Sequence, residues 1–96
     1  MFQINIAELM MINNPIIIDI RSSYSYSLGH ISGAISVPYY NLLSNYSHYL
    51  NRYSRYYLYC DTGDQSLEIA NRLQRFGYDT FSIMGGYQEY LRFIGG

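Results

Sequence analysis

Cys60 is the only cysteine of this 96-residue chain, and its position is typical of a reactive thiol. A strand-like run, 57–59, ends immediately before it, a polar loop containing Gly63 follows, and the helical spacing of apolar residues starts at Ser66. At the carboxyl end of a parallel strand, a side chain faces the crevice in which open α/β sheets bind ligands. A lone cysteine is often a small buried hydrophobe, but such a residue belongs in the middle of a strand. The sequence therefore predicts a nucleophile at Cys60.

Opposing charges surround the predicted thiolate. The N-terminus of the helix after the loop stabilises a nearby anion by ~0.3–1 kcal/mol. The loop also carries two carboxylates, Asp61 and Asp64, and a like charge at ~6 Å costs ~1–3 kcal/mol near a protein surface. Solvent screens those carboxylates if they point outward. The two effects are similar in size, so the sequence leaves open whether the loop favours the thiolate.

Strand-like and helix-like segments alternate along the whole chain. The predicted strands are residues 2–4, 15–20, 34–37, 55–59 and 80–84. The predicted helices are residues 6–12, 22–28, 40–49, 66–76 and 87–94. Segment 15–20 is a β-branched run without alternation, which is typical of a strand buried on both faces. This order predicts an α/β fold, a parallel sheet with helices on both faces.

The composition indicates one small domain without a strong charge. Ninety-six residues suffice for a single core, so we expect one domain over residues 1–96. Hydrophobic residues make up 49% of the chain and charged residues 14%, which excludes a disordered charged tail. The formal net charge of −1 attracts neither nucleic acid nor an anionic membrane. The two arginines among the tyrosines of segment 46–57 are too few for a nucleic-acid site.

Other features favour a soluble cytoplasmic protein. One cysteine cannot form an internal disulfide, and residues 1–15 contain no Lys or Arg to start a secretory signal. The apolar runs are far shorter than the ~20 residues that cross a bilayer. His30, His48 and Cys60 lack the spacing of metal ligands. We therefore expect no metal and no cofactor.

Three segments together resemble the rhodanese family, whose sulfurtransferases carry sulfane sulfur on a cysteine persulfide. The first is Ile17-Ile18-Asp19-Ile20-Arg21, followed by Gly29-His30-Ile31-Ser32-Gly33-Ala34-Ile35 and Val37-Pro38. The second, Cys60-Asp61-Thr62-Gly63-Asp64-Gln65-Ser66, resembles the active-site loop, and the third is Phe76-Gly77-Tyr78 with Met84-Gly85-Gly86-Tyr87. The resemblance covers residues 16–90 and implies a single rhodanese domain built on a five-stranded parallel sheet.

The resemblance implies a two-step transfer through a Cys60 persulfide. The thiolate takes sulfur from a donor, such as thiosulfate or a persulfide, and passes it to cyanide or a thiol. The expected substrate-binding residues are Arg21 and the loop, Asp61, Thr62, Gly63, Asp64, Gln65 and Ser66. The loop N–H groups would cradle the persulfide, and Gly63 lets the main chain turn. Expected partners are the small donor, the acceptor and a sulfur-relay protein, with no nucleic acid and no membrane.

Gln65 departs from the family pattern, because many members have arginine there. The segment 61–66 therefore has no cation, and a dianionic donor gains less binding than it would beside an arginine. This favours weak thiosulfate turnover, or a preference for protein persulfides or polysulfide.

Three residues near the predicted site have a structural interpretation as well as a functional one. Asp19 and Arg21 lie close to Cys60 if their strands are neighbours, and either residue could orient a substrate. We favour structural hydrogen bonds for both, because buried charges need partners. His30 is suited to acid–base chemistry, but it lies in a tight turn, and we expect a structural role for it too.

Two other functions fit the same resemblance. Cell-cycle dual-specificity phosphatases share the fold, but their loop is one residue longer and closes on an arginine that stabilises the phosphoryl group. Position 66 here is serine, and residues 61–66 contain no arginine, so the sequence disfavours a phosphatase. The alternative that stays open is a catalytically weak or inactive module that carries sulfur for, or binds, a partner protein. The presence of Cys60 in a glycine-containing loop disfavours it.

Overall fold

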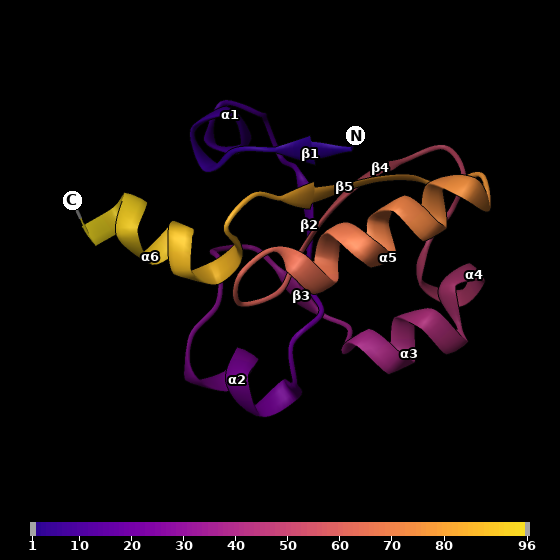
Figure 1. Ribbon diagram of the computed structural model, residues 1–96, viewed down its shortest axis with the longest axis horizontal. Helices are drawn as coiled ribbons and strands as arrows, with labels where there is room; N and C mark the ends of the chain where they lie inside the picture. The colour runs from indigo at the N-terminus through magenta and orange to yellow at the C-terminus, as the bar shows by residue number, and fades with distance from the viewer. Residues whose placement is uncertain (1, 96) are drawn as a thin grey trace.

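Five short parallel strands form the centre of the molecule, in the order β1-β5-β4-β2-β3. They are β1 (Gln3–Ile4), β2 (Ile16–Asp19), β3 (Ile35–Ser36), β4 (Arg55–Tyr59) and β5 (Asp79–Ile83). The computed structural model describes residues 2–95 (Figure 1). It confirms the predicted parallel sheet, while residues 1 and 96 of the predicted domain lie outside the described residues.

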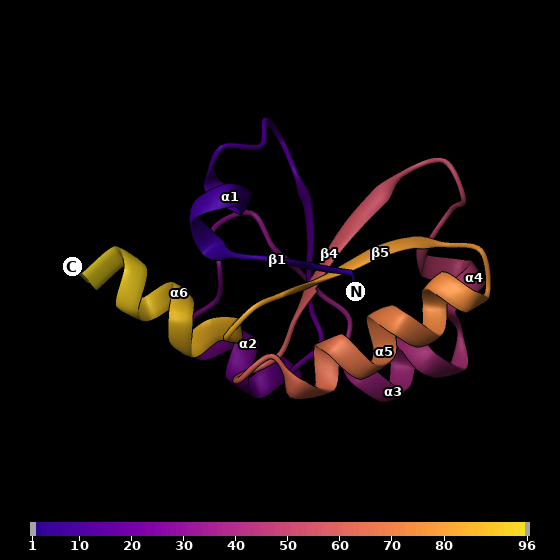
Figure 2. The ribbon, with the colours of Figure 1, turned by 45° about the horizontal axis from the view of Figure 1, so that its top comes forward.

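Helices cover both faces of the sheet, as predicted. They are α1 (Ile6–Met10), α2 (Ser23–Leu28), α3 (Tyr39–Ser44), α4 (Tyr46–Tyr49), α5 (Asp64–Arg75) and α6 (Gly86–Gly95). Leu42 of α3 and Leu73 of α5 belong to the core on one face. Leu9 of α1 belongs to the core on the other face, against which Tyr26 of α2 and Tyr87 of α6 pack. Figure 2 shows α1 on the opposite side of the strands from α3 and α5.

β4 lies in the middle of the sheet and alternates its side chains between the two cores. Tyr56 and Leu58 belong to the core under α5, whereas Tyr57 and Tyr59 belong to the opposite core. Cys60 continues the alternation and faces the α5 side. Because both faces are covered, residues 56–59 of the strand are all buried and hydrophobic, and only Arg55 at its start is exposed. The side-chain period of two therefore determines the face on which the thiol emerges.

Every helix departs from its predicted range by one or more residues, and two of these departures have a clear local cause. The segment 40–49 is not one helix, because Asn45 has φ −137° and ψ 39° and separates α3 from α4. α5 begins at Asp64, two residues before the predicted start, because Gly63 with φ 99° turns the loop directly into the helix. α5 has 12 residues, and no helix within residues 2–95 is long and apolar enough to cross a membrane.

Candidate active site

Cys60 directly follows β4 and lines a cleft of about 560 Å³. It is 5% exposed, so reagents reach the thiol through this cleft. The cleft is lined by the segment after β2, parts of α2 and α3, the loop after β4 and the start of α5: Ile20, Arg21, Ser22, Ser25, Pro38, Tyr39, Tyr40, Asn41, Cys60, Asp61, Thr62, Asp64 and Gln65. The structure thus brings Cys60 together with five of the predicted substrate-binding residues. The other two, Gly63 and Ser66, contact the sulfur itself.

Two backbone N–H groups point at the Cys60 sulfur. Gly63 N lies 3.2 Å and Ser66 N lies 3.4 Å from Sγ. Gly63 is the N-cap of α5 and has no side chain to accept hydrogen bonds from the first turn. The sulfur atom takes the place of that missing cap. It therefore lies at a helix N-terminus, where negative charge is favoured.

The first turn of α6 holds the main chain at Cys60 and Asp61. The N–H of Tyr87 donates to the carbonyl oxygen of Cys60 at 2.9 Å, and the N–H of Gln88 donates to that of Asp61 at 3.1 Å. A Cβ on Gly86 would collide with the Cys60 carbonyl oxygen and lie 2.8 Å from the Asp61 carbonyl carbon. Gly86 also has φ 59°, which favours glycine. This glycine allows α6 to approach closely enough to orient the start of the loop after β4.

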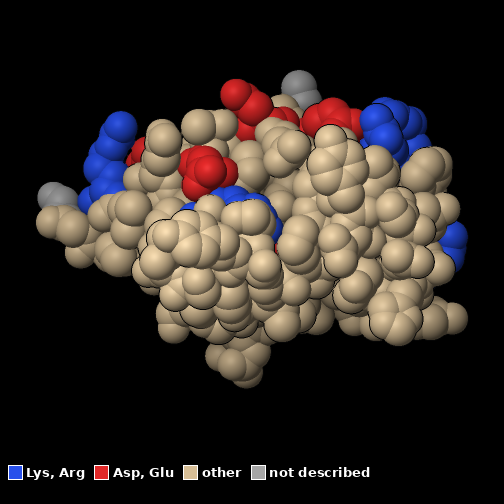
Figure 3. Space-filling model, turned by 90° about the horizontal axis from the view of Figure 1, so that it is seen from below, with Lys and Arg blue, Asp and Glu red and all other residues tan. Residues whose placement is uncertain are grey.

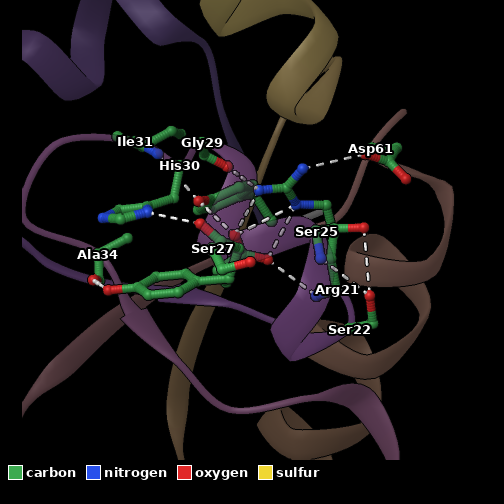
Figure 4. A network of polar contacts seen from close by, with 12 residues as sticks. Arg21, Ser22, Ser25, Ser27, Gly29, His30, Ile31, Ala34 and Asp61 are labelled. Carbon is green, nitrogen blue, oxygen red and sulfur yellow. Dashed lines mark hydrogen bonds and ion pairs between the residues drawn. The ribbon is translucent and has the colours of Figure 1, made fainter.

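Arg21 is a buried cation whose donors are engaged within the protein. Its Nε and Nη2 donate to the carboxylate of Asp19 at 3.1 and 2.7 Å, and Nη2 also donates to the carbonyl oxygen of Gly29 at 2.7 Å. Its Nη1 lies 3.4 Å from Oδ1 of Asp61 (Figure 4). Burial lowers the pKa of Arg21, but hydrogen bonding to Asp19 and the charge of Asp19 outweigh burial and raise it. The guanidinium therefore stays charged and joins three separate segments.

Tyr59 extends this buried network. Its hydroxyl donates to Oδ2 of Asp19 at 2.7 Å and accepts the N–H of Ile31 at 3.0 Å. Burial and the hydrogen bond to Asp19 raise the pKa of Tyr59, so the phenol stays protonated. The ring of Tyr87 covers the Arg21 guanidinium, with 4.2 Å between Cζ and the ring centroid. The network ties β2 and β4 to the loop that contains Ile31.

The structural contacts expected for Asp19, Arg21 and His30 are present. Asp19 and Arg21 form the ion pair described above. His30 Nδ1 lies 2.8 Å from the carbonyl oxygen of Tyr26, and the two rings stack with centroids 3.8 Å apart. Arg21 also lines the cleft. Its role in substrate binding stays a prediction.

Sequence reasoning missed three residues of the site. Tyr59 and Ser82, whose Oγ lies 2.7 Å from Oγ of Ser66, fall within predicted strands, and Gly86 falls between the predicted strand 80–84 and the predicted helix 87–94. A signal existed for the first two, because a hydroxyl on a strand buried on both faces needs a hydrogen-bond partner. No local signal places Gly86 against Cys60, since that contact depends on the positions of β4 and α6.

The cleft offers little positive charge. Figure 3 shows few charged side chains on the face of the molecule that contains α2 and α3. Asp61 and Asp64 line the cleft, and Arg21 is the one Lys or Arg among its lining residues. Arg21 is already paired with Asp19. Within the described residues 2–95, no group of His, Cys, Asp and Glu side chains is arranged to hold a metal ion.

Known proteins match the chain over nearly its whole length. A family model described as "Rhodanese-like domain" matches residues 5–92. The tRNA uridine(34) hydroxylase of Buchnera aphidicola is 28% identical over 87 residues, which cover 82% of this chain and 27% of that protein. The chain therefore spans about a quarter of the length of this curated relative.

Solved structures show the same fold. The rhodanese-related protein of Thermoplasma volcanium has a TM-score of 0.88 and 25% identity, covering 96% of this chain and 92% of that chain. A human single-domain sulfurtransferase has a TM-score of 0.82 and 19% identity, covering 96% of each chain. At that identity, the second likeness concerns the fold alone.

Proposed function

This chain belongs to the rhodanese-like domain family, and on that basis we propose that it is a sulfurtransferase that carries sulfane sulfur on Cys60. The observation that supports this most is the pair of N–H groups, from Gly63 and Ser66, directed at Sγ. A sulfur atom held by two donors at a helix N-terminus suits an anion. The cleft gives a donor access to that atom.

The proposed transfer has two half-reactions that balance without an external oxidant or reductant. In the first, the Cys60 thiolate attacks the outer sulfur of the donor. The sulfur–sulfur bond of the donor breaks, and its electron pair leaves as sulfite from thiosulfate or as a thiolate from a persulfide. In the second, the acceptor attacks the terminal sulfur of the Cys60 persulfide, and Cys60 leaves as a thiolate.

The charges at the cleft support donors other than a dianion. The Asp61 side chain is 63% exposed, and Asp64 is exposed as well. The charge of Arg21 is compensated by Asp19. A dianionic donor therefore meets carboxylates and no uncompensated cation among the residues that line the cleft. We propose protein persulfides or polysulfide as the better donors and thiosulfate as a weak one.

Intact-protein mass spectrometry tests the proposal, because the chain has one thiol. Incubation with polysulfide is expected to add the mass of one sulfur atom, and cyanide is expected to remove it with release of thiocyanate. Cys60→Ala, checked for its fold by circular dichroism, should gain nothing. If the folded wild type takes up no sulfur from polysulfide, a small-molecule persulfide or thiosulfate, the proposal of sulfur transfer is wrong. A non-catalytic module that binds a partner protein then explains the fold better.

A further inference from the structure

One buried hydroxyl group contacts the Cys60 sulfur, and a second buried hydroxyl group contacts the first. Ser66 on α5 is 0% exposed and Ser82 on β5 is 1% exposed, and their Oγ atoms are 2.7 Å apart. The Cys60 S–H donates to Ser66 Oγ at 3.6 Å, and the Ser66 O–H donates to the carbonyl oxygen of Gly63 at 3.2 Å. The Ser66 hydroxyl is thus in contact with the predicted reacting atom, whereas Ser82 contacts Ser66.

The Gly63 carbonyl does not depend on Ser66 for a hydrogen bond. It accepts the N–H of Leu67 at 3.1 Å, and Ser82 Oγ lies 3.5 Å from it. A serine hydroxyl has one donor and two acceptor sites, and its hydrogen rotates to suit its neighbours. Once Cys60 has lost its proton, the Ser66 hydrogen therefore has two acceptors within reach, the carbonyl oxygen of Gly63 and the sulfur. The Ser66 oxygen can accept the hydrogen of Ser82 in either state.

We propose that Ser66 is a third hydrogen-bond donor to the Cys60 thiolate and that Ser82 is a positioning residue that supports it. This inference deepens the proposed function and rests on it for its catalytic meaning. When Cys60 is ionised, the Ser66 O–H turns to Sγ and accepts a hydrogen bond from Ser82. When Cys60 carries a second sulfur, the negative charge moves to the outer atom, and the Ser66 O–H turns to Gly63. The hydroxyl thus stabilises Cys60 as the leaving group of the second half-reaction.

The rate of Cys60 alkylation by iodoacetamide against pH measures the thiolate without requiring sulfur transfer. Ser66→Ala is expected to raise the midpoint of this profile by about one pH unit, a tenfold lower thiolate fraction below it, because it removes a hydrogen bond to a charged atom. Above the midpoint, Ser66→Ala should react as fast as the wild type or faster, because a less stabilised thiolate is more nucleophilic. Ser82→Ala should shift the midpoint in the same direction by less.

Thr80→Val is the matched control for the loss of a buried hydroxyl. Thr80 lies on β5 two residues before Ser82, is 0% exposed, and donates to the carbonyl oxygen of Ala70 at 2.8 Å. Thr80→Val is expected to lower the free energy of unfolding without changing the midpoint of the alkylation profile. Ser66→Thr, which keeps the hydroxyl, should have the midpoint of the wild type. An unchanged midpoint in folded Ser66→Ala, or an equal shift in Thr80→Val, overturns the inference. If Ser66→Ala does not fold, Ser82→Ala, which leaves α5 unaltered, decides the question.

Release of sulfur from a preformed Cys60 persulfide is an independent measurement. At a pH above both midpoints, single-turnover release to cyanide should be about three- to tenfold slower in Ser66→Ala than in the wild type. Equal release rates contradict the leaving-group role. The two proposals can fail separately. A shifted midpoint in a protein that takes up no sulfur contradicts the sulfurtransferase alone, and uptake of sulfur with an unchanged midpoint contradicts the Ser66 donor alone.

Discussion

Replacing Tyr59 with phenylalanine removes a single hydroxyl group from the buried network around Asp19. That hydroxyl donates to Asp19 at 2.7 Å and accepts the N–H of Ile31 at 3.0 Å. A hydrogen bond to a charged group contributes ~1.5–3 kcal/mol, and a buried N–H without a partner costs ~1–3 kcal/mol. Both losses arise from one oxygen atom and are not additive, so we expect Tyr59→Phe to lower the free energy of unfolding by ~2–4 kcal/mol.

Urea unfolding followed by circular dichroism measures this change by linear extrapolation. Tyr53→Phe is the matched control, because Tyr53 is 98% exposed and a surface substitution changes stability by less than ~0.5 kcal/mol. A loss below ~1 kcal/mol in Tyr59→Phe, or an equal loss in Tyr53→Phe, would refute the reasoning.

The pH dependence of the same difference provides a second test. Burial and Asp19 raise the pKa of Tyr59 above the ordinary tyrosine value of 10.0. The unfolded chain therefore loses this proton first, and the stabilisation by Tyr59 is complete below pH 10 and decreases as the pH rises further. We expect the stability difference between the wild type and Tyr59→Phe to narrow above pH 10. A difference that widens there would contradict the assigned hydrogen bonds.

Two further substitutions test the proposed active-site loop, residues 60–66. Gly86→Ala should lower the free energy of unfolding by at least ~2 kcal/mol in urea, because it adds backbone strain and a collision with Cys60. Gly33→Ala is the control, because Gly33 also has positive φ but a Cβ there would meet open space. An equal loss of stability in Gly33→Ala would contradict the argument that Gly86→Ala collides with Cys60. Gln65→Arg adds a cation to the cleft and should raise kcat/KM for thiosulfate about three- to tenfold, most at low salt. No gain in steady-state assays would contradict the account of donor charge.

The central strands and the position of Cys60 could be predicted because their signals are local. Segment 55–59 was predicted as a strand, and β4 has those bounds. The strand end, the glycine-containing loop and the helix around Cys60 are consecutive in the chain, so their order alone places the thiol at a helix N-terminus. The break at Asn45 could not be predicted, because apolar spacing continues through the segment that α3 and α4 divide.

The sequence by itself determined the α/β class, the buried strands and the position of Cys60 before α5, since hydrophobic periodicity and chain order act over a few residues. Only the tertiary structure decided that α6 holds the Cys60 carbonyl, that Tyr59 meets Asp19, and that Ser66 meets Ser82. These partners are between 16 and 40 residues apart. Parallel pairing of β2, β4 and β5 brings them together. The register of such pairing depends on packing of the whole sheet and its helices, which no local pattern of residues specifies.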